Sequence, residues 1–149
     1  MTFVDETQRL MAIDPGAKRI GIAISDVSGT IARPLSVIKH HSRKLNAEKI
    51  AKIAQQYGIK KIIVGQSLDE NGNPTSSGKS AEYLAQELKS ICRCKILLID
   101  EEGTTKLAQQ TYFELGSSRK KRKGHHDDLA ASILLQSYID TCILAANKD

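Results

Sequence analysis

Acidic residues stand at the ends of three stretches that lie far apart in this 149-residue chain. They are Asp14, which closes an apolar stretch, then Asp100, Glu101 and Glu102, which close another, and Asp127 and Asp128, which open the last. In an open α/β sheet, sites form beyond the strand ends, where several loops meet. Carboxylates gathered there repel one another unless cations lie between them. Two Mg²⁺ or Mn²⁺ ions about 4 Å apart would fit, and such a pair can clamp the attacking water and the leaving oxygen of a phosphodiester.

Each acidic residue also has an ordinary structural explanation. Asp14 precedes Pro15-Gly16 and suits a turn, and the others suit the first turn of a helix, where negative charge is favourable. Their joint placement favours the metal site. Position also selects Asp127 over Asp128, because Asp127 shares a helix face with small and apolar residues three, four and seven positions on, namely Ala130, Ala131 and Leu134.

Hydrophobic periodicity and turn residues predict the elements that must position these groups. Strands are expected at 8–14, 19–25, 33–40, 61–65 and 95–100, and helices at 45–57, 80–90, 104–115 and 126–144. In the second helix, Tyr83, Leu84 and Leu88 form the expected buried side. Three leading strands without a helix predict an antiparallel meander, and the later alternation predicts parallel crossovers. The fold class is therefore α/β: one domain over residues 1–149, with a mixed five-stranded sheet and helices on both faces.

The positive charge of the chain is concentrated in one place. Lys and Arg number 22 against 17 Asp and Glu, and without the run Arg119, Lys120, Lys121, Arg122 and Lys123 the two signs balance. Such a block attracts a polyanion such as a phosphate backbone, although it also suits a solvated loop. Aromatic residues make up only 4% of the chain, which argues against a binding surface built on base stacking.

The chain has no apolar run long enough to cross a membrane and no secretion signal, so a cytoplasmic protein without a membrane partner is expected. Its three cysteines, Cys92, Cys94 and Cys142, are therefore expected as reduced thiols. A structural zinc site with the histidine pairs is the alternative, which the single-residue spacer of Cys92-x-Cys94 disfavours.

Four segments resemble, in order, the motifs of the YqgF family, which comprises pre-16S rRNA nucleases and Holliday junction resolvase-like proteins. The first is Asp14 to Asp26, and the second is Ile63-Val64-Gly65 with the Gly- and Asn-bearing loop after it. The third is Asp100 to Thr105, and the fourth is His126 to Gln136. Together they span nearly the whole chain, and the first and last are the most specific.

The resemblance implies an RNase H-like fold with a two-metal nuclease centre. Matched by motif position, its acidic triad is Asp14, Glu101 and Asp127, and its implied role is trimming the 5′ end of precursor 16S rRNA in the bacterial cytoplasm. Lys18 and Arg19 match the basic pair of the first motif and are candidate phosphate contacts, with exposed hairpin cations as the alternative. The chain departs from the family where Glu102 and Gly103 replace its usual Arg and Leu, and where Gln66-Ser67 replaces an apolar residue and Pro.

Three other functions remain open on the sequence. A four-way-junction resolvase also begins with Asp-Pro-Gly and would act as a symmetric dimer, whereas the nuclease could be a monomer or a homodimer. A nucleic-acid-binding module without catalysis is favoured by the charge reversal at Glu102. An actin-like ATPase lobe is disfavoured because 149 residues leave no room for its second lobe. Structured RNA is the favoured partner, and branched DNA is the alternative.

Overall fold

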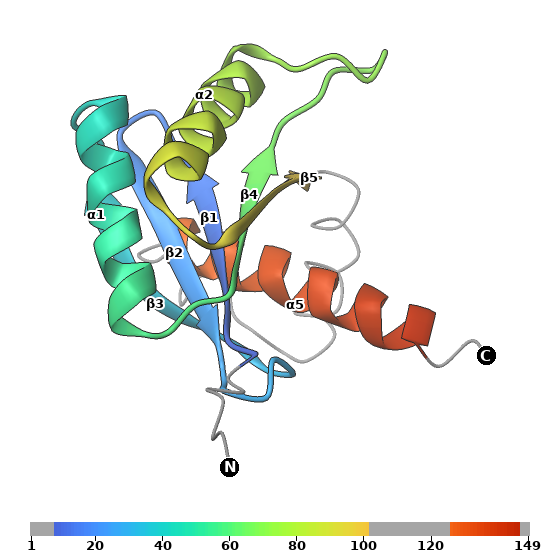
Figure 1. Cartoon of the computed structure of the whole chain (residues 1–149). Helices are drawn as coiled ribbons and strands as arrows, with labels where there is room; N and C mark the ends of the chain where they lie inside the picture. The colour runs from blue at the N-terminus through green and yellow to red at the C-terminus, as the bar shows by residue number, and fades with distance from the viewer. Residues whose placement is uncertain (1–7, 102–125, 147–149) are drawn as a thin grey trace.

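The structure is a computed structural model that describes residues 8–101 and 126–146, with the side chains of the last helix described from 129 to 145 (Figure 1). The predicted helix over 104–115 and the basic run Arg119–Lys123 lie outside the described residues.

A five-stranded mixed sheet forms the centre of the molecule. Its strands are β1 (Leu10–Pro15), β2 (Arg19–Ser25), β3 (Ala32–Lys39), β4 (Lys61–Gln66) and β5 (Lys95–Asp100), in the spatial order β3-β2-β1-β4-β5. The first three strands are antiparallel, and β4 and β5 run parallel to β1. The predicted meander followed by parallel crossovers is confirmed. The carboxyl ends of β1, β4 and β5 therefore meet at one edge of the sheet.

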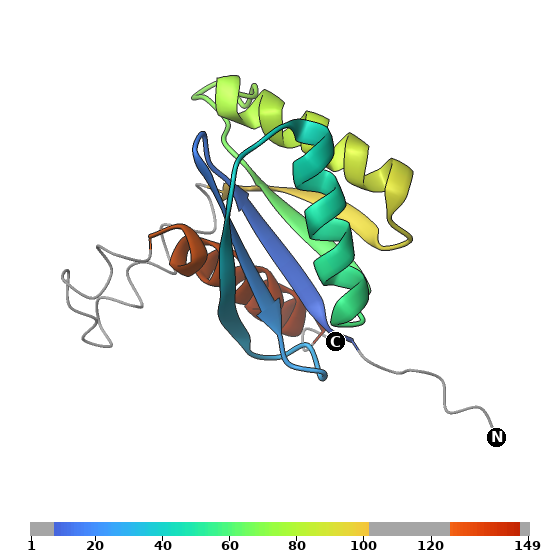
Figure 2. The same ribbon diagram turned by 90° about the vertical axis from the view of Figure 1, so that its left-hand side faces the viewer.

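Helices cover both faces of the sheet, as predicted. Figure 2 shows α1 (Arg43–Gln56) and α2 (Ser76–Ile91) on one side and α5 (His126–Ala146) on the other. The last helix packs mainly against β2, β3 and β1, although these strands come first in the sequence.

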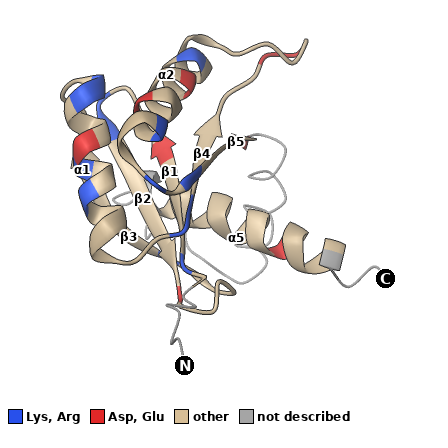
Figure 3. Ribbon diagram, in the orientation of Figure 1, with Lys and Arg blue, Asp and Glu red and all other residues tan. Residues whose placement is uncertain are grey.

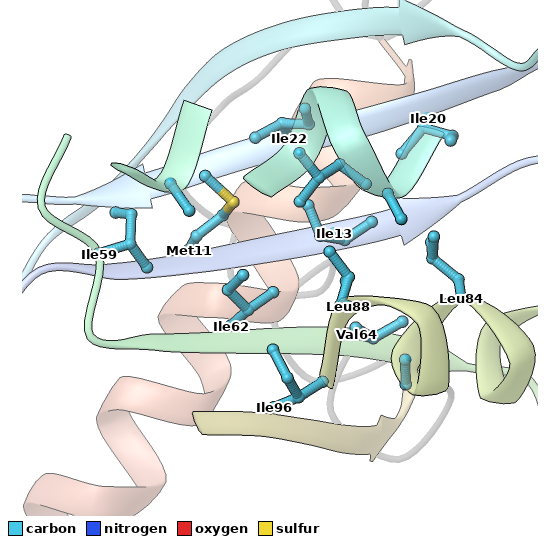
Figure 4. Close-up of a cluster of buried hydrophobic side chains, with 14 of the residues drawn as sticks. Met11, Ile13, Ile20, Ile22, Ile59, Ile62, Val64, Leu84, Leu88 and Ile96 are labelled. Atoms are coloured by element: carbon cyan, nitrogen blue, oxygen red, sulfur yellow. The ribbon is translucent and has the colours of Figure 1, made fainter. Parts of the chain in front are cut away.

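The two faces of the sheet carry side chains of different size. Large residues such as Met11, Ile13 and Ile62 are fully buried towards α1 and α2, where they form the larger core cluster (Figure 4). Towards α5, β1 and β2 present the small residues Ala12 and Ala23, next to Ile63 of β4. Because successive strand residues point to opposite faces, the alternation of large and small side chains lets α5 lie close to the sheet beside the end of β1.

Two expectations about α2 are wrong. The helix begins at Ser76 instead of residue 80, because the hydroxyl of Thr75 accepts a hydrogen bond from the backbone N–H of Gly78 at 3.1 Å and caps it. Tyr83 is also not on the buried side: it is 46% exposed, and the Arg43 guanidinium lies 4.3 Å from its ring centroid. Leu84 and Leu88 are buried as expected.

The turn between β2 and β3 predicts a defined dependence of stability on pH. The Asp26 carboxylate accepts hydrogen bonds from the Ser28 hydroxyl at 2.6 Å and from the backbone N–H groups of Thr30 and Ile31 at 2.9 and 3.1 Å. These bonds, that of Ser28 first, hold the pKa of Asp26 well below its ordinary value. A carboxyl whose pKa is lower in the folded state stabilises the fold above its unfolded-state pKa, and that contribution is lost as the pH falls.

We therefore expect Asp26→Asn to lower the free energy of unfolding more near pH 7 than at about pH 2, where the pH has fallen below the ordinary pKa of Asp and part of the contribution is already lost. Urea titrations of both proteins at the two pH values measure this. An equal loss at both would mean that the turn acts through packing and not through the charge of Asp26.

Candidate active site

Asp14 lies near the end of the central strand β1. Its neighbours across the sheet are Gly21 of β2 and, on the other side, the end of β4, where Ile13 pairs with Val64. The side chain is half-buried. Strand alternation places Asp14 on the same face as Ala12, which is the face that α5 covers.

Glu101 follows β5 directly and reaches back over the sheet towards the same place. A Cβ atom built on Gly65 would lie 3.6 Å from Glu101 Cδ and 3.0 Å from Leu134 Cδ2 of α5. The carboxyl group of Glu101 therefore lies above Gly65, between the sheet and α5. The adjacent Asp100 pairs in register with Gln66 and is exposed. Glu101, the residue that the motif match selects, is thus the one whose carboxyl group lies near Gly65, and its role at a metal site stays a prediction.

Gly65 forms the floor between the two carboxylate-bearing strands. Its strand β4 lies between β1 and β5, whose backbones are thus separated by roughly 10 Å, two strand spacings. A Cβ atom on Gly65 would also lie 3.5 Å from the carbonyl oxygen of Ile13, the residue before Asp14. The missing side chain lets Leu134 and the Glu101 carboxyl approach the strand closely. Sequence reasoning did not assign this role to Gly65 or to Leu134, although a glycine at the end of an apolar strand is a signal of close approach by another group.

Asp127 belongs to the first turn of α5, and its side chain lies outside the described residues. The helix face predicted to carry it does pack on the sheet: Ala131 and Leu134 are fully buried, and Ala130 is half-buried. Leu134, two turns after Asp127, is the residue that contacts the Gly65 position. The convergence of Asp127 with Asp14 and Glu101 remains a prediction.

The basic pair Lys18 and Arg19 lies in the β1–β2 hairpin, directly beyond Asp14, and both side chains are exposed. The backbone N–H of Gly16 donates to the carbonyl oxygen of Arg19 at 2.9 Å, and a Cβ on Gly16 would collide with that oxygen. The turn therefore requires glycine. The five cations from Arg119 to Lys123 lie outside the described residues.

The loop after β4 keeps a defined connection to α2 despite the unusual Gln66-Ser67. The Gln66 side-chain amide donates to Glu82 Oε1 at 2.8 Å and to the carbonyl oxygen of Gly78 at 3.3 Å. The Ser67 carbonyl oxygen accepts from the backbone N–H of Thr75 at 3.1 Å. The hydrogen bonds of Gln66 and Ser67 thus fasten the ends of this loop at the edge that carries the acidic residues.

The side chains that the structure describes contain no group of three or more His, Cys, Asp and Glu residues able to hold a metal ion. Of the acidic triad, two members, Asp14 and Glu101, have described side chains.

Cys92, Cys94 and Cys142 are free thiols, as expected. Burial, followed by the neighbouring Cys94, raises the pKa of the Cys92 thiol to about 11, which keeps it protonated. None of the described helices is long and apolar enough to span a membrane.

A protein-family model described as RuvX, Holliday junction resolvase, matches residues 8–141. The chain belongs to the RuvX family. A relative from Thermoanaerobacter pseudethanolicus is 42% identical over 89% of this chain and 96% of its own length, and one from Bacillus cytotoxicus is 32% identical over 89% and 98%. Both carry the name "Putative pre-16S rRNA nuclease".

The solved structures that resemble this RuvX chain show its fold. They include Thermus thermophilus RuvC in complex with a Holliday junction substrate, with a TM-score of 0.58 and 15% identity over 91% of this chain and 96% of that one. The fowlpox virus resolvase in complex with Holliday junction DNA has a TM-score of 0.55 and 15% identity, over 91% and 99%. The RNase H-like fold that the sequence resemblance implied is confirmed.

Proposed function

We propose that this RuvX protein is a divalent-metal-dependent nuclease that hydrolyses phosphodiester bonds near the 5′ end of precursor 16S rRNA. The observation that carries the proposal is the approach of the Glu101 carboxyl to Gly65 under α5, on the strand next to that of Asp14, although 87 positions separate the two acidic residues in the sequence. The relatives' names supply the RNA substrate, and the proposed cytoplasmic location follows from that substrate.

The donor groups fit a hard divalent cation. Carboxylate oxygens are the ligands that Mg²⁺ and Mn²⁺ take up, and the absence of a side chain at Gly65 lets the Glu101 carboxyl approach the strand next to that of Asp14. In the proposal, Asp14 on the central strand, together with Glu101 and Asp127, would hold the ions. Bound ions would supply a water of lowered pKa and stabilise the charge that develops on the phosphate.

The residues of the chain itself hold and orient the substrate. Lys18 and Arg19, exposed directly beyond Asp14, can contact phosphates on either side of the cleaved bond. The amino end of α5 carries positive helix-dipole charge, which favours a phosphate near the start of this helix. Because Ala12 and Ala23 let α5 lie close to the sheet, the acidic residues are covered on one side and open at the strand ends.

A test of this proposal compares three nucleic acids in one assay. The purified protein is incubated with precursor 16S rRNA, a generic single-stranded RNA and a four-way DNA junction, each with Mg²⁺, with Mn²⁺ or with a chelator. We expect cleavage of the precursor in the presence of either ion and its loss, by at least about 100-fold, on chelation. Activity that survives chelation would exclude the metal mechanism. Preferred cleavage of the junction would favour the resolvase activity in the family description.

A further inference from the structure

A groove on the opposite face from the candidate active site is lined by cations. It lies between α1 and the connection from α2 to β5, and its volume is about 1150 Å³. The cationic side chains that line it are Lys49 and Lys52 of α1, Lys60 before β4 and Arg93 before β5, and all four are exposed. Among the described residues that line the groove, Glu48 is the single acidic one. Figure 3 shows basic positions on α1 and at the starts of β4 and β5.

The groove is continuous with the edge of the molecule that carries the acidic residues. At one end it includes His41, which follows β3 and precedes α1. The neighbouring His40 donates its backbone N–H to the carbonyl oxygen of Lys18, in the hairpin beside Asp14, at 3.0 Å. From there the groove follows α1, whose 14 residues span about 21 Å, to Lys60 at the opposite edge of the sheet.

We propose that this groove binds the phosphate backbone of a single-stranded RNA segment that flanks the cleaved bond. The inference rests on the proposed nuclease function and extends it to the part of the RNA outside the active site. Phosphates pair with Lys49, Lys52, Lys60 and Arg93, while the exposed side chains of Leu45 and Ile91, 51% and 48% accessible, contact sugars and base edges. Since no Phe, Tyr or Trp is among the described lining residues, the contact depends little on base sequence.

An acidic polypeptide segment is the other polyanion that could occupy a cationic groove. The continuity with Lys18 favours RNA, because a strand held at the hairpin beside Asp14 is led directly to His41 and into the groove. An acidic polypeptide that binds only in the groove would not need to contact the hairpin of Lys18 at this end.

The test uses the full chain with Asp14→Asn, in the presence of a chelator, so that binding is measured without cleavage. Two RNAs are compared: a short one that spans the cleavage site, and the same RNA with a single-stranded extension. We expect the extension to tighten binding, and the triple variant Lys49→Glu, Lys52→Glu, Arg93→Glu to remove this gain. Loss of three phosphate contacts corresponds to about 10- to 100-fold in the dissociation constant of the extended RNA, and to a fall of about 2 in the slope of log affinity against log salt.

A matched control reverses three exposed cations outside the groove, Arg33→Glu, Lys79→Glu and Lys89→Glu. In this control, the extension should still tighten RNA binding. If both triple variants lose this gain in affinity equally, the proposal is overturned in favour of an effect of net charge. If the groove variant keeps the gain, the groove does not bind RNA. If instead polyglutamate binds the wild-type protein in a groove-dependent way and the extension has no effect, the site is one for acidic polypeptides. Cleavage of the short RNA by the groove variant with Asp14 intact tests the nuclease function separately.

Discussion

Replacing Asp14 by Asn should reduce metal-dependent cleavage by at least about 1,000-fold, the scale on which removal of a group at the reaction centre acts. Asn keeps the size of the side chain but removes the negative charge that holds two cations together. The residue is half-buried near the end of the central strand. It pairs with Gly21 of β2 through the backbone, and the substitution leaves that pairing intact. The measurement is the rate of precursor cleavage at saturating Mg²⁺, together with the thermal unfolding curve.

The matched control is Asp140→Asn, an exposed carboxylate on α5 that accepts a hydrogen bond from Gln136 and lies outside the site. It should cleave at the wild-type rate. RNA binding in chelator should be retained by Asp14→Asn, because the phosphate contacts come from cations elsewhere. If Asp14→Asn cleaves and binds like the wild-type protein, the acidic triad is not the reaction centre.

Filling the space above Gly65 should have the second largest effect. The Cβ of Gly65→Val would lie 3.0 Å from Leu134 Cδ2, and its two methyl groups would extend further towards Glu101, whose Cδ is 3.6 Å from the Cβ position. Overpacking of this kind costs about 1–3 kcal/mol of stability. Displacement of the Glu101 carboxyl should in addition lower activity about 10- to 100-fold and raise the Mg²⁺ concentration needed for half-maximal rate.

A second substitution separates the two effects. Leu134→Ala in the Gly65→Val background removes the close contact with α5 but leaves the new methyl groups beside Glu101. The double variant should recover part of the unfolding free energy lost by overpacking, while its weakened metal dependence persists. If the Mg²⁺ dependence of Gly65→Val equals that of the wild-type protein, Gly65 is not the floor of the metal site.

The sheet could be predicted from the sequence because its pattern is local. The bounds of Arg19–Ser25 and Lys95–Asp100 match the prediction, since each strand is a short apolar run between polar or turn residues. The start of α2 could not be predicted in the same way. Ser76 to Ser80 has the composition of a loop, and it is helical because the Thr75 hydroxyl caps Gly78 and the Ser67 carbonyl oxygen binds the start of the helix. The first contact is a local cap between residues three positions apart, and the second joins residues eight positions apart across the loop.

The part of the candidate site that could be predicted is the position of its acidic residues at the carboxyl ends of strands. Asp14 and Glu101 lie at the same edge because β1 and β5 are parallel, which the alternation of strands and helices indicates. The role of Gly65 and the exposure of Tyr83 became apparent only from the structure. The role of a glycine can be assigned only when the group that packs against it is known. An aromatic residue on the predicted buried side of a helix can stay exposed when a cation such as Arg43 stacks on it.

The position of α5 has a consequence for protein synthesis. The sheet face under this helix is formed by β1, β2 and β3, which emerge from the ribosome before α5 does. Under the proposed mechanism, the metal site needs both Asp14 and Asp127, and Asp127 is encoded more than a hundred codons later. Under that mechanism, a nascent chain that lacks α5 would be unable to cut RNA, and nuclease competence would begin only after α5 has been synthesised.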